Sequence, residues 1–289
     1  MIKKIIIGTA QFGFDYGIKN KVGKIDKENI IKILKLAQKK KILYLDTSKE
    51  YGDSEKRISF YNKPNWKIIT KISIKKIYKK NEKEIMYFFL RQIKDSKKKM
   101  NINNVYALLL HNADYLTKKG GEKFYKVLRN LKKNGFIKKF GYSIYSFRNL
   151  KKICKRFKPD IIQCPFNVFD RRLLKKENLD YLKKKKIEVH VRSVFLQGLL
   201  LEENTLPRKF SRWNKLMKKW DNWINYTRLS RLEGCLNFVN NVKGVDRVLI
   251  GVDNFKQFQE ITNIKYKNKL KFPKYLQSKD QKLINPNLW

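Results

Sequence analysis

Short apolar segments alternate along the chain with longer stretches in which apolar residues recur at helical spacing. The apolar segments cover residues 3–9, 42–47, 66–72, 105–111, 138–144, 160–166, 188–194 and 246–252. Most of them are apolar almost throughout, which is typical of strands that are buried on both faces of a parallel sheet. In residues 27–41, 122–135 and 231–244 the apolar positions instead follow i, i+3, i+4 and i+7, which predicts amphipathic helices.

Eight predicted strands, each followed by a predicted helix or by a loop that could hold one, indicate a β/α barrel. Eight is the strand count of the TIM barrel, a closed ring of parallel strands surrounded by helices. We therefore predict an α/β fold in which residues 1–289 form a single (β/α)8 TIM barrel. An open, doubly wound parallel sheet is the alternative arrangement of the same elements.

The charge of the chain bears on its partners. The chain contains 69 Lys and Arg residues but only 25 Asp and Glu residues, which gives a formal net charge of +44. Such a charge is compatible with nucleic acid or an anionic surface as partner. The lysines, however, are spread through every segment, and they far outnumber the arginines that favour specific base readout. We interpret the charge as coding bias in a chain rich in Lys, Ile and Asn, and expect no specific nucleic-acid partner.

Cysteine usage and apolar run lengths indicate the compartment. Cys154, Cys164 and Cys235 form no C-x-x-C pair, which predicts buried free thiols in a reducing environment. The apolar run near the N-terminus is only about three to six residues long, shorter than the roughly 7–15 of a secretory signal. No segment approaches the ~20 apolar residues of a membrane span. We therefore expect a soluble, cytoplasmic protein.

Four side chains capable of proton chemistry fall at successive predicted strand ends, where barrels place their active sites. Asp46 ends the second predicted strand, Tyr51 follows in the next loop, Lys71 closes the third strand and His111 closes the fourth. Each residue alone has a plainer explanation, such as a turn aspartate or a packing residue. Together they are expected to lie on one face of the barrel.

These four residues form a plausible proton-transfer set. A phenol titrates near 10, and a nearby ammonium group lowers that pKa. Asp46 would pair with Lys71, because an unpaired buried charge is costly, and His111 would hydrogen-bond the same reacting oxygen. The set predicts protonation of a carbonyl oxygen as hydride arrives at its carbon. Metal-binding spacings, G-x-G-x-x-G and the P-loop are absent from the sequence, so the hydride donor must bind in another way.

At these positions the sequence resembles the aldo-keto reductases, and the resemblance extends over nearly the full chain. The segments that carry it are "GTAQFG" (8–13), "LDTSKEYGDSE" (45–55), "TK" (70–71), "LLLHN" (108–112), "GYSIYS" (141–146), "IIQCPFNVFDRR" (161–172), "VRSVFLQGLL" (191–200) and "VLIGVDNFKQFQE" (248–260). The resemblance implies a TIM barrel that binds NADPH, or else NADH, extended across its carboxyl-terminal face. It also implies that Tyr51 is the general acid of carbonyl reduction, tuned by Lys71 and Asp46, while His111 orients the carbonyl.

The resemblance further implies a set of cofactor-binding residues. Ser143 and Gln163 would hold the nicotinamide carboxamide, and Arg192 stands where many members stack an aromatic ring on the nicotinamide. The remaining implied residues are Thr9 at the first strand end, Ser193, Leu196 and Gly198 over the pyrophosphate, and Gly251, Gln257 and Glu260 at the adenosine half. Gln257 replaces an Arg that in many members lies near the 2′-phosphate, so we expect only a modest preference for NADPH over NADH.

Substrate and role are less narrowly predicted. "GTAQFGFDYGI" together with "VRSVFLQGLL" resembles bacterial members associated with sugar and surface-polysaccharide metabolism, which favours a small carbonyl substrate such as a sugar derivative. Arg171, Arg172 and Arg192 could contact an anionic or polyhydroxylated substrate, or "DRR" could be a salt-bridge cluster at a helix start. The alternative function is an NADPH-binding, redox-sensing regulatory barrel with little turnover. The sequence does not give the oligomeric state.

Overall fold

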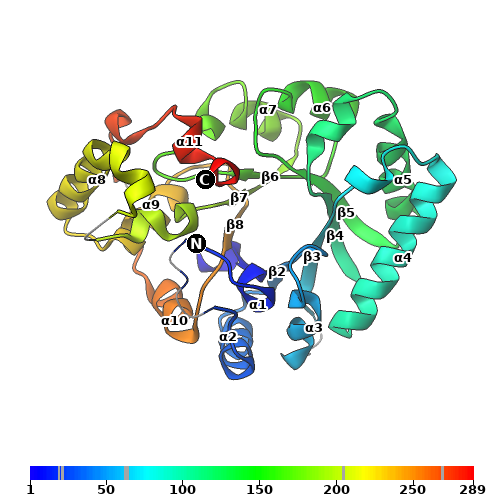
Figure 1. The fold of residues 1–289 in the computed structure, drawn as a ribbon, viewed down its shortest axis with the longest axis horizontal. Helices are drawn as coiled ribbons and strands as arrows, with labels where there is room; N and C mark the ends of the chain where they lie inside the picture. Colours follow the sequence, from blue (N-terminus) through cyan, green and yellow to red (C-terminus); the bar gives the residue numbers. More distant parts are fainter. Residues whose placement is uncertain (19, 21–22, 62–64, 204–205, 268–269) are drawn as a thin grey trace.

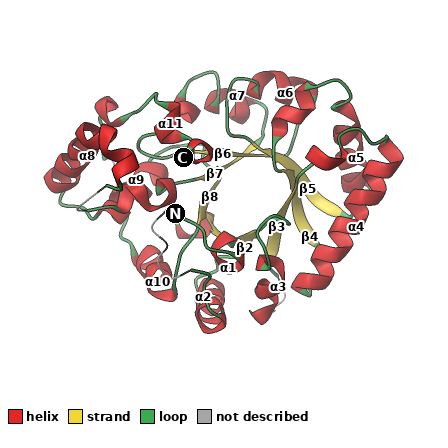
Figure 2. Cartoon of the chain, viewed as in Figure 1, coloured by secondary structure: helices red, strands yellow, loops and turns green. Residues whose placement is uncertain are grey.

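The computed structural model describes residues 1–18, 20, 23–61, 65–203, 206–267 and 270–289. Within these residues, parallel strands pair in chain order and close into one barrel (Figures 1 and 2). The strands are β1 (Ile5–Gly8), β2 (Tyr44–Asp46), β3 (Lys67–Ile72), β4 (Val105–Leu110), β5 (Ile137–Ser143), β6 (Ile161–Pro165), β7 (Glu188–Arg192) and β8 (Arg247–Ile250). Each of the eight predicted apolar segments contains one of them, except that β5 begins one residue before its segment, so the predicted TIM barrel is confirmed and the open sheet is excluded.

The helices surround the barrel (Figure 2). They are α1 (Ala10–Gly13), α2 (Lys27–Lys39), α3 (Ser54–Ile58), α4 (Glu82–Met100), α5 (Glu122–Lys133), α6 (Leu150–Arg156), α7 (Leu179–Lys184), α8 (Asn214–Thr227), α9 (Arg231–Asn240), α10 (Phe255–Asn263) and α11 (Gln281–Ile284). The three helices predicted from periodicity are α2, α5 and α9, each ending two to four residues before the predicted end. Asp26 begins α2 by accepting a hydrogen bond from the Asn29 backbone, a standard N-cap.

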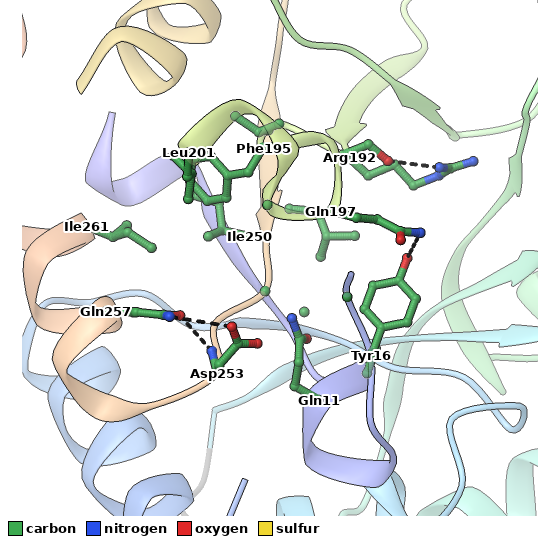
Figure 3. A pocket seen from close by; sticks show the side chains of 18 of the residues that line it. Gln11, Tyr16, Arg192, Phe195, Gln197, Leu201, Ile250, Asp253, Gln257 and Ile261 are labelled. Atoms are coloured by element: carbon green, nitrogen blue, oxygen red, sulfur yellow. Dashed lines mark hydrogen bonds between the residues drawn. The ribbon is translucent and has the colours of Figure 1, made fainter. Parts of the chain in front are cut away.

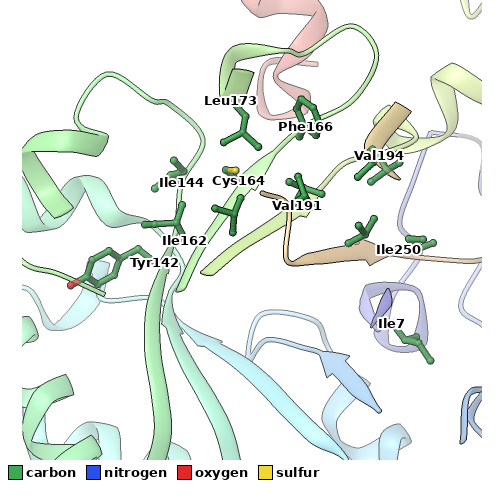
Figure 4. Packing of buried hydrophobic residues seen from close by; sticks show 14 of the residues in the cluster. Ile7, Tyr142, Ile144, Ile162, Cys164, Phe166, Leu173, Val191, Val194 and Ile250 are labelled. Carbon is green, nitrogen blue, oxygen red and sulfur yellow. The ribbon is translucent and has the colours of Figure 1, made fainter. Parts of the chain in front are cut away.

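Two apolar clusters hold the barrel together. The larger lies between the strands and the surrounding helices, and Figure 4 shows part of it on the outer faces of β5 to β8. The smaller fills the barrel interior and consists of Ile6, Tyr44, Ile69, Ala107, Leu109 and Ile161. Side chains alternate between the two faces of a strand, so consecutive residues enter different clusters. A buried Leu or Ile truncated to Ala in either cluster would cost about 2–5 kcal/mol.

The thiols match their prediction. Cys154, Cys164 and Cys235 are all free and buried. Burial raises the pKa of Cys154 and Cys164 to about 12. These thiols therefore serve as packing groups and not as nucleophiles. Among the described residues, no helix combines the length and apolar character that crossing a membrane requires.

The connection after β7 is the longest departure from simple β/α alternation. It contains the 3₁₀ segment η6 (Leu196–Leu201), then α8 and α9 before β8. Trp220 and Trp223 of α8 stack with ring centroids 5.3 Å apart, and the Trp220 indole donates to the Leu200 carbonyl at 3.1 Å. These contacts fix α8 against η6. As a result α8, α9 and α10 lie together at one side of the barrel (Figure 1).

Candidate active site

The interior cluster explains how the predicted catalytic residues converge. Asp46 follows Tyr44 by two residues, Lys71 follows Ile69, and His111 follows Leu109, and each earlier residue belongs to the interior cluster. Because side chains repeat every two residues on a strand, the later residues also point to the barrel axis. They form the next layer towards the carboxyl ends of the strands. The structure therefore brings Asp46, Lys71 and His111 together directly above the smaller apolar cluster of the barrel interior.

A buried ion pair lies at the centre of this layer. The Lys71 ammonium pairs with Asp46 Oδ1, and both side chains are at most 2% exposed. Lys71 Nζ also donates to the Thr47 carbonyl at 3.3 Å, and Gln163 Nε2 donates to the second oxygen of Asp46 at 2.8 Å. Each charge thus has a partner, which is the condition for burying it.

Tyr51 enters the site from the loop after β2. Lys71 Nζ lies 3.4 Å from the Tyr51 hydroxyl and 5.0 Å from the centroid of its ring. The Tyr51 and His111 rings meet edge to face, with centroids 6.2 Å apart. The short run from Asp46 to Tyr51 therefore places a phenol beside an ammonium group and an imidazole. The four predicted catalytic residues share one cavity wall.

Glycines let this loop approach α1 closely. A Cβ on Gly13 would lie 1.7 Å from the Tyr51 carbonyl oxygen, and a Cβ on Gly52 would lie 2.6 Å from the Gly13 carbonyl. Gly52 also has a φ of +56°, a left-handed conformation that favours glycine. The "YG" of this segment therefore has a structural cause. A side chain at Gly13 would push Tyr51 away from Lys71.

A hydroxyl network fixes the same loop from behind. Ser54 Oγ lies 2.7 Å from both the Thr9 hydroxyl and the Thr9 carbonyl, and Thr9 Oγ1 donates to the Asp46 carbonyl at 3.0 Å. Thr9 is completely buried. Its side chain ties β1, β2 and α3 together one layer behind the cavity, which gives it a positioning role in this structure.

A buried carboxylate provides further support. Glu55 is 3% exposed and accepts hydrogen bonds from Thr70 at 3.0 Å and Ser96 at 2.8 Å. Its other oxygen lies 3.1 Å from the ammonium of Lys49, which belongs to the loop that carries Tyr51. The network joins that loop to β3 and α4. Sequence analysis included Glu55 in the resemblance but gave it no structural role.

The pKa of Tyr51 differs from the sequence-based expectation. Burial raises the pKa of the Tyr51 phenol well above its ordinary value, the Asp46 carboxylate raises it further, and Arg192 opposes these effects. The expected lowering by Lys71 is therefore wrong for this structure, since removal from water outweighs the nearby cations. The phenol stays protonated at neutral pH and can act as a proton donor.

His111 experiences opposing effects. Burial, Lys71 and Arg192 lower the pKa of His111, whereas the Glu50 carboxylate raises it, and the net shift is downward. Glu50 Oε2 lies 2.5 Å from His111 Nδ1, an ion-pair distance without the geometry of a hydrogen bond to that nitrogen. The imidazole is therefore neutral at neutral pH. Sequence analysis missed Glu50, whose only signal is its place directly before Tyr51.

A cavity of about 1150 Å³ extends from these residues across the carboxyl-terminal face. That volume lies slightly above the usual range for ligand pockets, about 300–1,000 Å³. Figure 3 shows Arg192, Gln197 and Tyr16 on one side, Gln11 in the middle, and Asp253 and Gln257 on the other. The predicted residues that line it are Asp46, Tyr51, Lys71, His111, Ser143, Gln163, Arg192, Ser193, Gly198, Gly251, Gln257 and Glu260. Leu196 instead lies fully buried, in the apolar cluster outside the strands.

Several features of the wall fit a dinucleotide. Ser143 and Gln163 are register partners on β5 and β6. Gln163 Oε1 is buried without a hydrogen-bond partner in the described part of the chain, and it could accept from a carboxamide. A Cβ on Gly251 would lie 2.6 Å from the Gln11 amide, so this glycine keeps the middle of the cavity open. Backbone φ angles of +58° at Ser193 and +91° at Gly198 shape the loop above it.

The three arginines suggested by the sequence have different environments. Arg192 stacks on the Tyr145 ring at 4.2 Å and donates to the Ile144 carbonyl at 3.1 Å, while lining the cavity. Arg172 instead makes two hydrogen bonds to the Asp170 carboxylate, at 2.9 and 2.7 Å. Arg171, 7% exposed, donates to the Val168 and Phe272 carbonyls. Arg171 and Arg172 of "DRR" therefore have structural contacts, and of the three arginines only Arg192 lines the cavity.

Some lining residues belong to segments that carry the resemblance but were not themselves predicted as site residues. They are Gln11, Tyr16, Tyr145, Gln197 and Asp253. Gln197 Nε2 lies 3.4 Å from the Tyr16 hydroxyl, which joins the loops after β1 and β7 across the cavity (Figure 3). Such contacts depend on how distant loops fold over the barrel, so spacing along the chain could not reveal them.

The chain is similar to proteins of known family and structure. The model of the aldo/keto reductase family matches residues 4–275. Among solved structures, a holo form of an aldo-keto reductase from Bacillus halodurans matches with a TM-score of 0.70 at 17% identity, covering 91% of this chain and 87% of that one. The glycerol dehydrogenase of Gluconobacter oxydans matches with a TM-score of 0.67 at 19% identity, covering 90% and 85%. A search of curated proteins gave no match.

Proposed function

Because the chain belongs to the aldo/keto reductase family, we propose that it reduces an aldehyde or ketone to the alcohol with Tyr51 as proton donor. The observation that carries this proposal is the buried Lys71–Asp46 pair beside a phenol that opens onto a large cavity. A nicotinamide dinucleotide, when bound, supplies the hydride. The protein's task is to hold the carbonyl compound and to deliver the proton.

Each residue of the set has a proposed part in proton delivery. Tyr51 donates its proton to the carbonyl oxygen, whose basicity rises sharply as the carbon is reduced, so a phenol with a raised pKa is still a competent acid. Lys71 stabilises the phenolate that results, and Asp46 holds Lys71 in place. The neutral imidazole of His111 hydrogen-bonds the same oxygen and orients it.

The cavity wall supplies the proposed cofactor contacts. Ser143 and the unsatisfied oxygen of Gln163 would hold the carboxamide, and the Arg192 guanidinium would lie near the nicotinamide ring. The loop with Ser193 and Gly198 would cover the pyrophosphate. Gly251, Gln257 and Glu260 would line the adenosine half, while Thr9 and Leu196 would act from behind the wall. The family resemblance favours NADPH as this dinucleotide, and NADH is the other candidate.

We propose a polyhydroxylated carbonyl compound, such as a sugar derivative, as substrate. Many polar side chains line the cavity, among them Tyr16, Asn20, His111, Tyr145, Arg192 and Gln197. Such a wall suits hydroxyl groups better than a long apolar chain. The similarity in fold to a glycerol dehydrogenase, a protein named for a polyol, agrees with this substrate class.

The test is a screen of dinucleotide oxidation. Absorbance of NADPH and NADH would be followed with simple aldehydes, sugars and sugar derivatives, at roughly physiological salt. Turnover that depends on both dinucleotide and carbonyl compound supports the proposal. Tight dinucleotide binding without turnover on any carbonyl compound would contradict it and favour a redox-sensing barrel.

A further inference from the structure

The cavity end away from Tyr51 is acidic, although the chain as a whole is strongly basic. The wall of this part is formed by η6, α9, α10 and the adjoining loops, and its described residues that line the cavity include the carboxylates Glu202, Glu203, Glu233, Asp253 and Glu260. The cations that line it are Arg231 and Lys265. With 69 basic and 25 acidic residues in the chain, scattered charges would have produced the opposite balance. We call this part of the cavity the far end.

Asp253 occupies the wall of the far end in a fixed position. Its backbone amide donates to Gln257 Oε1 at 2.8 Å, and Gln257 Nε2 lies 3.4 Å from Asp253 Oδ2 (Figure 3). The Asn254 side chain caps α10 by accepting from the Gln257 amide at 2.9 Å. The start of α10 therefore presents a carboxylate and an amide as one bonded unit. Burial raises the pKa of Asp253, which means that negative charge is already poorly solvated at this place.

The nearby cations compensate only part of the negative charge at the far end. Arg231 is 8% exposed and forms an ion pair with Asp221, which satisfies one arm of its guanidinium. Its Nη1 is buried without a partner in the described residues and is the strongest candidate for a phosphate contact. Lys256, the cation directly before Gln257 in the chain, is exposed and is not among the residues that line the cavity.

We propose that the far end binds an adenosine ribose with free 2′- and 3′-hydroxyls, so that NADH is preferred over NADPH. This inference rests on the proposed function, which places the nicotinamide at Tyr51 and therefore the adenosine at the far end. A carboxylate accepts hydrogen bonds from a ribose diol, whereas an arginine suits a 2′-phosphate. The phosphate carries a charge of about −1.5 to −2 at pH 7 and would meet Asp253 and its acidic neighbours. The modest NADPH preference expected from the sequence is thereby reversed.

Fragments of the cofactor test this inference without catalysis. Isothermal titration would measure the affinity of the unmodified protein for 5′-AMP and for 2′,5′-ADP (adenosine 2′,5′-bisphosphate), which differ only in the 2′-phosphate. We expect 5′-AMP to bind about 10-fold more tightly, since like-charge juxtaposition costs several kcal/mol. NADH and NADPH should show the same order in direct titrations. Tighter binding of 2′,5′-ADP would overturn the inference.

Two variants identify the responsible charges. Asp253→Asn should reduce the ratio of the two fragment affinities by about fivefold, because it removes a charge while keeping the shape of the side chain. Asp180→Asn, at an exposed position of α7, is the matched control for the change in net charge and should leave the difference unaltered. If 2′,5′-ADP binds more tightly and Arg231→Met abolishes that gain, Arg231 is a phosphate site and the inference is wrong. Binding of neither NADH nor NADPH would instead refute the proposed function.

Discussion

The two ends of the cavity differ in how their charges are balanced. At the Tyr51 end every charge of the central pair is neutralised: Lys71 contacts Asp46, and Asp46 accepts from Gln163. At the far end carboxylates outnumber cations, and one arm of Arg231 is left without a partner among the described residues. The charges of the central pair balance each other at the first end, whereas negative charge is in excess at the second.

Their architecture explains the difference. Asp46, Lys71 and His111 stand at or directly after the ends of neighbouring strands, where register and alternation fix each side chain. The far end is assembled from η6, α9, α10 and their loops, which tolerate substitution more readily than strand ends do. On the proposed function, the strand ends hold the groups that deliver the proton, and the loops and helices of the far end select the cofactor. The following predictions test this separation.

The largest expected effect comes from Tyr51→Phe. Loss of the proton donor should lower kcat and kcat/KM together by about 10²–10⁴-fold, the usual contribution of general acid catalysis. Affinity for NADH and NADPH should change less than about threefold, since only the Tyr51 end is altered. Steady-state kinetics and titration measure the two quantities. Tyr226→Phe, at an 87% exposed residue of α8, is the control. Near-normal turnover of Tyr51→Phe would remove the phenol from the mechanism.

Lys71→Met should have the next largest effect, on stability. Removing one member of a buried pair leaves the Asp46 charge uncompensated and should reduce the free energy of unfolding by about 3–5 kcal/mol. Urea denaturation measures this change. Combining Lys71→Met with Asp46→Asn should restore much of the loss, and Lys138→Met at an exposed position should stay within about 0.5 kcal/mol of the unmodified protein. A stable Lys71→Met single variant would show that the pair is not desolvated as described.

Gln257→Arg should alter the far end alone. A guanidinium at this position should increase the affinity for 2′,5′-ADP relative to 5′-AMP by roughly 10-fold, with Asp253 competing for the new charge. The kcat for carbonyl reduction should stay unchanged. Gln259→Arg, an exposed position two residues further along α10, controls for the added charge. If both variants raise the relative affinity equally, the long-range field of the protein and not the cavity wall selects the cofactor.

Glu50→Gln should give the smallest effect, confined to the acidic limb of the pH profile. Glu50 raises the pKa of His111, so its removal should lower that pKa further and move the loss of activity to lower pH. Between about pH 7 and pH 10 both proteins should show a flat kcat/KM, because the pKa of His111 is lowered and that of Tyr51 is raised. The pH dependence of kcat/KM, measured for both proteins, tests this prediction. An acidic limb that moves to higher pH would show that Glu50 does not raise the pKa of His111.

The sequence alone determined the barrel and one end of the cavity. Eight apolar segments predicted eight strands, and the position of Asp46, Lys71 and His111 at strand ends predicted their convergence. Both inferences rest on periodicity and on the parallel order of neighbouring strands, which a linear pattern records directly. Even the Tyr51 loop was marked by its glycine, although the reason, close contact with Gly13, required the structure.

Only the tertiary structure decided the pKa of Tyr51 and the charge of the far end. The sequence placed a lysine beside the phenol and so suggested a lower pKa, but the degree of burial, which depends on the whole fold, reverses that direction. Glu202, Glu233 and Asp253 lie far apart along the chain, and η6, α9 and α10 bring them to one wall. Burial and long-range electrostatics are sums over neighbours from many segments, and for that physical reason they could not be derived from local sequence patterns.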